Sequence, residues 1–240
     1  MNANLSVFKS QKRGNEPSDY EDASEPSLSV EIHAERPSIA ISDGATESSF
    51  ASLWASLLVT AFVNSDLPIE ERFSSAVKKG ARIWRRIVDS KTLPWYAEEK
   101  RKRGAFATLL GTCFTERGNW ESIAVGDSCF FKVDSNGDVS SFPIKDENEF
   151  GTTPPLVCGR NTELRSVTRT TGEWSEGDLF FWMTDAAAHW FLHEARTGLR
   201  PWDIIASFPA CEAFDSWLAS ARDSGIMRND DVTILLLRVE

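Results

Sequence analysis

Several aspartates of this chain share one local setting, because each stands where an apolar run begins or ends. Taken singly, each is explained by the preference of aspartate for turns and helix starts. Taken together, they could supply oxygen ligands from several chain segments, which is what hard divalent cations need. Carboxylates brought close without a cation would repel one another and resist ionisation. The aspartates in this setting are Asp43, Asp127, Asp185, Asp230 and Asp231.

Asp43 has the best-defined surroundings of the group. The segment 38–42 alternates polar and apolar residues, which predicts a short strand, and Asp43-Gly44 follows as a turn. Capping-type residues at 46–48 and apolar residues at helical spacing predict a helix from Thr46 to about Asn64. A carboxylate at a strand end, beside a glycine and in front of a helix, can point out of the sheet edge toward a cation.

Other motifs are less informative. His189 and His193 could share a helix face, but no glutamate follows His189 as in the zinc-protease pattern. The segment DSNGD (134–138) imitates the start of a calcium-binding loop, but Val139 and Lys145 occupy the glycine and glutamate positions, so a hairpin turn is predicted. The four cysteines lie far apart, which argues against a structural zinc site.

The composition restricts the classes of partner. The chain has 240 residues, 41% of them hydrophobic, which is enough for a sizeable core. Its formal net charge of −10 argues against nucleic acid or an anionic membrane as the main partner. No run approaches the roughly 20 apolar residues of a membrane span, and the first thirty residues lack the apolar core of a signal peptide. A cytoplasmic location is therefore expected.

The elements that must position the aspartates follow in blocks. Residues 1–13 are expected to be a flexible segment and 14–240 the folded domain. Strands are predicted at 29–33 and 38–42, which a turn joins, then at several places between 104 and 142, and at 164–171, 178–183 and 232–239. Helices are predicted at 46–64, 67–88, 186–196 and 211–223, with Ile83 on the inner face of the second. This order predicts an α+β fold, with two sheets packed face to face and helices outside.

Five short motifs, in their order and spacing, resemble those of the metal-dependent Ser/Thr protein phosphatases of the phosphatase 2C family. The similarity extends from about Gly14 to Val239. The matching segments are YEDA (20–23) for the early Glu-Asp motif, IAISDG (39–44) for the strand ending in Asp-Gly, AVGDS (124–128) for the Gly-Asp-Ser turn, GDLFFWMTD (177–185) for the strand ending in Ser-Asp-Gly, and NDDVT (229–233) for the terminal Asp-Asn-x-Thr motif.

The resemblance implies a four-layer αββα sandwich of two antiparallel sheets, with helices on both outer faces and a two-metal centre at one end. Asp43 would bridge two Mn²⁺ or Mg²⁺ ions, and the Gly44 carbonyl would help to bind one. The remaining assignments implied by the family are Glu21, Asp185 and Asp230 as further metal ligands, Asp127 at a third and weaker metal position, Asp22 and Asp231 supporting the ligands from behind, Asp43 and Asp185 as the catalytic pair, and Arg13 as the nearest candidate for binding phosphate.

The resemblance also implies the reaction. A water that bridges two cations would attack the phosphorus of a phosphoserine or phosphothreonine in line, with no phosphoenzyme. The substrate would be a phosphorylated protein, in a signalling role, and any regulation would come from a separate partner. The chain departs from the family pattern at 45–48, where ATES replaces a glycine-rich loop, and in the spacing of Arg13. These departures favour an alternative, in which the chain is a phosphatase-like binding or regulatory module with little or no turnover.

Overall fold

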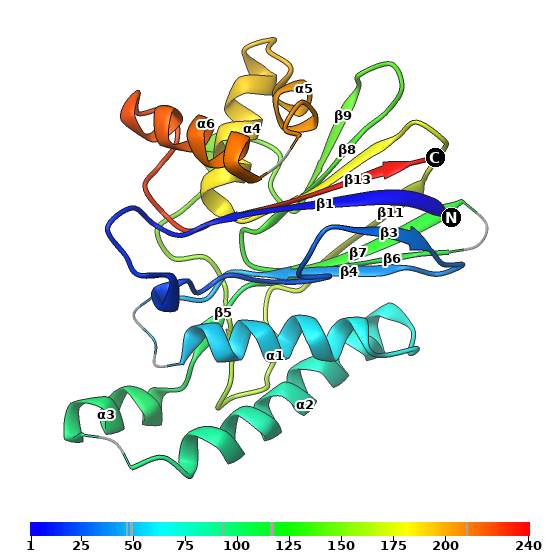
Figure 1. Ribbon diagram of the computed structural model, residues 1–240. Helices are drawn as coiled ribbons and strands as arrows, with labels where there is room; N and C mark the ends of the chain where they lie inside the picture. The colour runs from blue at the N-terminus through cyan, green and yellow to red at the C-terminus, as the bar shows by residue number, and fades with distance from the viewer. Residues whose placement is uncertain (47, 49, 93, 116–117, 210) are drawn as a thin grey trace.

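The computed structural model describes residues 1–240 apart from 47, 49, 93, 116–117 and 210, and it contains two large antiparallel sheets packed face to face (Figure 1). One sheet has six strands in the order β3-β1-β13-β12-β8-β9, and the other has five in the order β11-β7-β6-β4-β2. The six strands are β1 (Asn2–Ser10), β3 (Val30–His33), β8 (Cys129–Val133), β9 (Val139–Phe142), β12 (Leu179–Met183) and β13 (Val232–Val239). The five are β2 (Ala23–Glu25), β4 (Ser38–Ser42), β6 (Leu109–Phe114), β7 (Asn119–Val125) and β11 (Thr168–Glu173).

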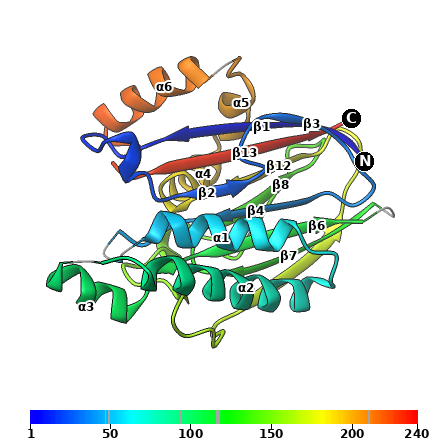
Figure 2. The ribbon, with the colours of Figure 1, turned by 60° about the horizontal axis from the view of Figure 1, so that its bottom comes forward.

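Helices cover both outer faces of the sandwich (Figures 1 and 2). On the five-stranded sheet lie α1 (Ala51–Val63) and α2 (Ile69–Asp89), and on the six-stranded sheet lie α4 (Asp185–Arg196), α5 (Pro201–Ala206) and α6 (Cys211–Asp223). A further helix, α3 (Trp95–Arg103), projects beyond one end of the sandwich, next to the short strand pair β5 (Phe106–Ala107) and β10 (Val157–Cys158). The predicted α+β class and αββα sandwich are confirmed.

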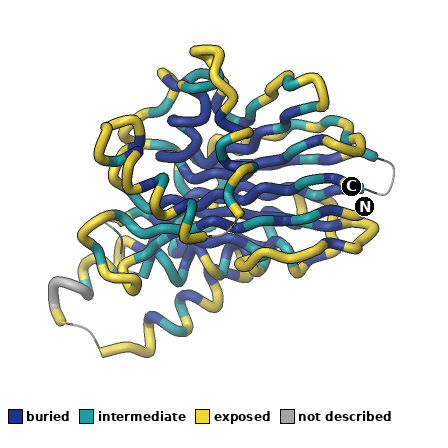
Figure 3. The backbone as a smooth tube through the Cα atoms, turned by 45° about the horizontal axis from the view of Figure 1, so that its top comes forward, coloured by how far each residue is buried: buried dark blue, intermediate teal, exposed yellow. Residues whose placement is uncertain are grey.

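The layers follow from strands that are apolar on both faces. In β12, Phe180 and Trp182 point between the sheets, whereas Phe181 and Met183 pack under the helices, because successive side chains point to opposite faces. The sequence LFFWM therefore reads as a continuous apolar run, as a strand buried on both sides must. Figure 3 shows the buried backbone running through the middle of the sandwich.

The expectation of a flexible segment at 1–13 is wrong for Asn2–Ser10, which form β1 between β3 and β13. The strand alternates, with Ala3, Leu5 and Val7 buried between the sheets, and it pairs with β13 from Ala3↔Val239 to Ser10↔Val232. Its polar residues hide this pattern in the sequence, and the pairing that orders it comes from the far end of the chain.

Three smaller expectations also need correction. The strands at 29–33 and 38–42 do not form one paired unit, because β3 belongs to the six-stranded sheet and β4 to the five-stranded sheet. Helix α1 begins at Ala51 rather than Thr46, after Phe50 in a left-handed conformation. Ile83 is 38% exposed rather than on the inner face of α2. The predicted DSNGD turn does join β8 to β9. None of the helices in the described part of the chain is long and apolar enough to cross a membrane.

Candidate functional site

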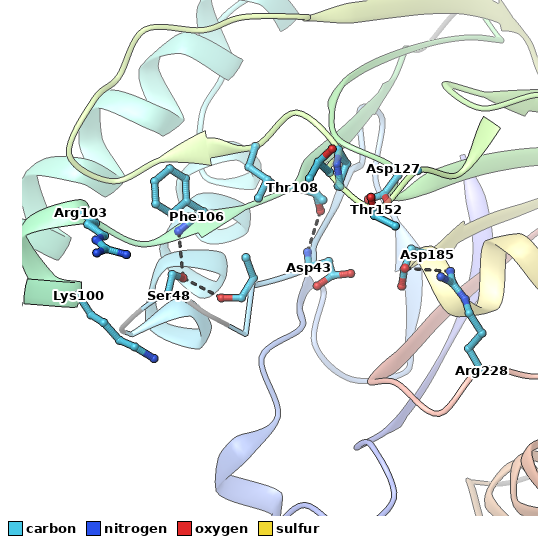
Figure 4. A pocket seen from close by; sticks show the side chains of 16 residues that line it. Asp43, Ser48, Lys100, Arg103, Phe106, Thr108, Asp127, Thr152, Asp185 and Arg228 are labelled. Carbon is cyan, nitrogen blue, oxygen red and sulfur yellow. Dashed lines mark hydrogen bonds and ion pairs between the residues drawn. The ribbon is translucent and has the colours of Figure 1, made fainter. Parts of the chain in front are cut away.

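A cavity of about 880 Å³ opens at the end of the sandwich where the sheets meet the turns. Asp43, Asp127 and Asp185 line it together, although they follow β4, β7 and β12 in three distant parts of the chain (Figure 4). The structure therefore brings three of the sequence-predicted carboxylates to one place. Glu21, Asp22, Asp230 and Asp231 are not among the residues that line the cavity, and the contacts described below link them to it.

Thr108 fixes the backbone at Asp43. The Asp43 amide donates to the Thr108 hydroxyl at 2.8 Å, and the Thr108 amide donates to the Asp43 carbonyl, also at 2.8 Å. The Thr108 hydroxyl also shares a hydrogen bond of 2.7 Å with the Ser128 hydroxyl, which ties Asp43 to the turn that carries Asp127. Gly126 allows this contact, because a Cβ there would come within 2.5 Å of the Thr108 Cγ2.

Gly44 allows the segment carrying Glu21 to approach Asp43. A Cβ on Gly44 would lie 2.7 Å from the Glu21 carbonyl oxygen and 3.1 Å from backbone and side-chain atoms of Ala51. Only glycine leaves room for two backbone segments this close. The glycine of the Asp-Gly motif is thus required by packing, and it leaves Glu21 beside the Asp43 turn.

Asp22 is fully enclosed and connects three motifs. Its Oδ2 accepts hydrogen bonds from the hydroxyls of Thr184, at 3.0 Å, and Thr233, at 2.9 Å. Thr184 precedes Asp185 and Thr233 closes the NDDVT segment, so one carboxylate links the early, middle and terminal motifs. Its Oδ1 is buried with no hydrogen-bond partner among the described residues. A buried carboxylate oxygen left in this state is costly unless a cation or water stands near it.

Asp231 holds the N-terminal segment rather than facing the cavity. Its Oδ1 accepts from the Lys12 amide at 2.7 Å, and its Oδ2 accepts from the Glu21 amide at 2.8 Å. The neighbouring Asp230 is half-exposed, and its Oδ1 accepts from the Asp231 amide at 3.1 Å. The two aspartates of NDDVT therefore differ in role: Asp231 secures the backbone before Glu21, and Asp230 keeps a solvent-facing carboxylate.

Asp185 opens α4 and is paired with Arg228. The Arg228 Nη2 donates to the Asp185 Oδ2 at 2.9 Å, and both residues line the cavity. Burial raises the pKa of the Asp185 carboxyl, although the Arg228 guanidinium opposes this rise. Arg228 therefore brings a positive charge to the carboxylate end of the cavity.

The carboxyl groups repel one another. Burial raises the pKa of Asp43 well above its ordinary value, and the charges of Asp22, Asp185 and Asp127 raise it further. Burial and then the charge of Asp185 raise the pKa of Asp127 to about 6. The pKa of Glu21 is raised mainly by burial, with Asp231 and Asp230 adding to the effect. Negative groups held close in this way favour any positive charge brought among them.

The donor set fits a hard divalent cation. Every candidate ligand is an oxygen, the carboxylates raise one another's pKa, and the buried Asp22 Oδ1 lacks a partner among the described residues. Within the described residues, no three His, Cys, Asp or Glu side chains form a group that could hold a metal ion. A cation bound here must therefore keep water in part of its coordination sphere, as Mg²⁺ usually does.

The structure does not bring Arg13 to the cavity. Its Nη1 donates to Asp223 of α6 at 2.6 Å, and its Nη2 donates to the Ala219 carbonyl at 3.0 Å. Arg228 is the arginine that the structure places beside Asp185, and sequence reasoning missed it. The available signal was its position directly before the segment NDDVT (229–233), which had already been singled out. Thr108 and Thr184 were also missed, since their role depends on which strands meet.

Two residues of the altered segment 45–48, Ala45 and Ser48, are held by hydrogen bonds, whereas Glu47 lies outside the described residues. The Ser48 hydroxyl donates to the Ala45 carbonyl at 2.8 Å and accepts from the Phe106 amide at 3.2 Å. The Ala45 amide also donates to the Phe106 carbonyl at 2.9 Å. Ala45 and Ser48 are thus attached to β5, and both line the cavity.

Comparison with known proteins gives one family. A family model described as Protein phosphatase 2C matches residues 14–229. A comparison with curated protein sequences finds no match. Among solved structures, the catalytic domain of the serine threonine protein phosphatase PstP in complex with two manganese ions is 17% identical, with a TM-score of 0.63 and 99% of each chain covered.

Two further structures have the same fold. RsbX in complex with magnesium is 17% identical, with a TM-score of 0.62, and the match covers 100% of this chain and 96% of that one. PppA, a regulatory component of T6SS in Pseudomonas aeruginosa, is 15% identical, with a TM-score of 0.61 and coverage of 100% and 99%. At such identities the likeness establishes the fold.

Proposed function

The chain belongs to the protein phosphatase 2C family, and from this premise we propose that it is a metal-dependent phosphatase of phosphoserine and phosphothreonine in proteins. The observation that carries the proposal is the meeting of Asp43, Asp127 and Asp185 in one open cavity, where their charges raise one another's pKa. A cavity of about 880 Å³ has room for a phosphorylated side chain and part of its peptide.

The proposed cofactors are two Mn²⁺ or Mg²⁺ ions, with a third and weaker position at Asp127. The solved structures of PstP with manganese and RsbX with magnesium support this choice of metals. The residues that would hold the two ions are Glu21, Asp43, Gly44 through its carbonyl, Asp185 and Asp230. When bound, such cations lower the pKa of a coordinated water and offset charge on phosphoryl oxygens.

The chain itself contributes the positioning of these groups. The Thr184 and Thr233 hydroxyls orient Asp22, and Thr108 fixes the backbone of Asp43. Asp231 secures the amide of Glu21, so that the early and terminal motifs stay together. Hydrogen-bonded supports of this kind commonly change metal affinity or activity by roughly 10–100-fold when removed.

Arg228, in place of Arg13, is proposed to hold the phosphoryl group. Its guanidinium lies at the carboxylate end of the cavity, beside Asp185 (Figure 4). A planar guanidinium can donate two parallel hydrogen bonds to phosphoryl oxygens, which suits it to this role. Arg13 is engaged with Asp223 on α6 and is not among the residues that line the cavity.

Manganese-dependent hydrolysis of p-nitrophenyl phosphate and of a phosphothreonine peptide tests the proposal. Asp43→Asn should lower turnover about a thousandfold, equal to about 4 kcal/mol of barrier. Asp138→Asn, in the exposed β8–β9 turn, is the matched control and should leave the rate unchanged. Turnover that survives Asp43→Asn at the wild-type rate would sink the proposal.

One observation favours the alternative of a binding or regulatory module. The Arg228–Asp185 ion pair places a positive charge where a cation would be expected, and a module without turnover could keep this arrangement. Calorimetry that shows two Mn²⁺ ions bound per chain, together with sustained hydrolysis of p-nitrophenyl phosphate, would exclude this alternative. A signalling role, a cytoplasmic location and a separate regulatory partner stay predictions from the sequence.

A further inference from the structure

The cavity has a second end with the opposite charge. Lys100 and Arg103 of α3 line it beyond Ser48 and Phe106, away from the aspartates (Figure 4). We propose that this end binds an anionic group of the substrate, carried by residues next to the phosphorylated one, so that the protein prefers acidic phosphopeptides. This inference rests on the proposed function, because it places the phosphorylated residue at the aspartate end.

Within the described part of the chain, neither cation is held by a buried ion pair. Lys100 is exposed, and none of the described carboxylates is within ion-pair distance of it. Arg103 pairs with Glu99 at 2.6 Å, but the two side chains are 72% and 64% exposed, and such surface pairs contribute little. In a chain of net charge −10, a pair of basic residues inside a cavity is an unusual local surplus of positive charge.

The helix that carries these cations is fastened to the body of the protein. Arg160 donates to both carboxylate oxygens of Asp89, at 3.0 and 2.5 Å, and its Nε donates to the Arg101 carbonyl at 3.3 Å. The same guanidinium lies over the Trp84 ring, 5.2 Å from its centroid. One arginine thus joins the end of α2, the last turn of α3 and the segment after β10.

The chain leaves α3 by a path that fits closely. Gly104 has a φ of +97°, and a Cβ there would lie 2.9 Å from the Arg160 Cγ. The Gly104 amide closes the last turn by donating to the Lys100 carbonyl at 3.2 Å. Because the helix end is held by these contacts, Lys100 and Arg103 are positioned before a substrate arrives, which reduces the entropic cost of binding.

Ser48 lies between the two ends of the cavity (Figure 4). Its hydroxyl accepts from the Phe106 amide, and the Ala45 amide donates to the Phe106 carbonyl, so the chain just after Asp43 is joined to the strand that follows α3. These contacts hold the backbone of the reacting end and the backbone of the recognition end at a set separation.

The lining of the cavity also fits a peptide. Phe106 provides apolar surface beside Arg103 (Figure 4), and Pro154 and Leu156 add apolar lining to the same cavity. Basic residues at the C-terminal end of a helix also stabilise the helix dipole, and Lys102 shares this role with Lys100 and Arg103. Lys102 is exposed on the same turn but does not line the cavity. A substitution of Lys102 therefore tests the effect of charge at the helix end alone, without a change in the cavity.

The test measures binding of labelled peptides that carry a non-hydrolysable phosphonate in place of phosphothreonine. The peptides have flanking Glu, flanking Gln, or a second phosphothreonine, on either side, and fluorescence anisotropy gives each Kd. On one side at least, the Glu or doubly phosphorylated peptide should bind about fivefold tighter than the Gln peptide, because two exposed ion pairs contribute modestly. Comparison of the Glu peptide with the doubly phosphorylated peptide shows whether the anion is an acidic side chain or a second phosphate group.

Lys100→Glu should remove this preference, whereas Lys102→Glu should keep it. Equal affinities for all peptides, or equal losses in both variants, would overturn the inference. Turnover of p-nitrophenyl phosphate by the wild-type protein is measured in parallel with Mn²⁺. The binding measurement does not require turnover, so the two proposals can fail separately. A protein that prefers acidic peptides but does not hydrolyse p-nitrophenyl phosphate would refute the proposed function and support the recognition site.

Discussion

The two ends of the cavity are built in different ways. At the aspartate end, hydroxyls of Thr108, Thr184 and Thr233 hold carboxylates and backbone from widely separated segments, mostly out of solvent. At the basic end, one projecting helix supplies both cations, and Arg160 supplies much of its attachment. The groups at the aspartate end are therefore held by many contacts from separate segments, whereas the basic end depends on few contacts. Few substitutions would be enough to change the substrate preference.

The largest expected effect comes from Gly44→Ala, at the aspartate end of the cavity, where two backbone segments lie close together. The new Cβ would meet the Glu21 carbonyl at 2.7 Å, so backbone must move, at a cost of about 3 kcal/mol of unfolding free energy. Mn²⁺ binding should weaken with it. Gly151→Ala is the control, because a Cβ there meets nothing closer than 4.0 Å. Equal urea midpoints for the two variants would mean that the aspartate end is not tightly packed.

Asp127→Asn tests the repulsion at the same end. The pKa of Asp127 in the folded chain, about 6, lies above the unfolded value, so the folded state binds more protons between the two and loses stability as the pH rises through that window. In EDTA, the variant should be about 3 kcal/mol more stable than wild type near pH 8, because the pKa of Asp127 is raised from 3.8 to about 6. The gain should shrink toward zero near pH 2, which lies below both pKa values, so that Asp127 is protonated in both states. A gain that does not change with pH in urea titrations would contradict this account.

Arg228→Gln probes the arginine that lines the aspartate end of the cavity. If its guanidinium holds the phosphoryl group, KM for p-nitrophenyl phosphate should rise about tenfold, equal to about 1.4 kcal/mol, because charged hydrogen bonds are lost. The Mn²⁺ concentration for half-maximal rate should not rise, since Asp185 loses a competing partner. Arg82→Gln, on the exposed side of α2, is the control. An unchanged KM would remove Arg228 from substrate binding.

Arg160→Gln has the smallest expected effect and isolates the basic end. It removes the bonds to Asp89 and to the Arg101 carbonyl, so α3 loses much of its attachment and keeps the pair of Arg101 with Asp89 at 3.8 Å. The preference for acidic over neutral peptides should fall about threefold, while the rate with p-nitrophenyl phosphate should not change. Arg165→Gln, which loses only an exposed pair with Glu163, serves as the control. A fall in the p-nitrophenyl phosphate rate would show that the two ends are not independent.

The aspartate end could be predicted because its signals are local. A strand followed by Asp-Gly at 43–44, and an apolar strand followed by Asp185, each place a carboxylate at a sheet edge. The order of the five motifs resembled that of the protein phosphatase 2C family, and the match to the family model confirmed this membership. The αββα sandwich followed from the blocks of strands and helices, since strands such as β12 are apolar on both faces.

The remainder depended on contacts between distant segments. The strand at Asn2–Ser10 is ordered by pairing with the last strand, more than 200 residues away, and its polar residues gave no sign of this. The charged run at 98–103 gives no local sign that Lys100 and Arg103 line a cavity together with Asp43. Arg13 was the one arginine considered for phosphate from the sequence, and Arg228 was not considered, because the turn at 228–231 decides which arginine reaches Asp185.

Anomalous diffraction from crystals soaked in Mn²⁺ tests the central claim most directly. The account predicts two strong manganese peaks beside Asp43, with Asp185 turned toward metal and Arg228 released from it. Soaked Asp43→Asn crystals should lose these peaks. No peak at this end of the sandwich, with the Arg228–Asp185 ion pair intact, would contradict the claim that these carboxylates form a metal centre.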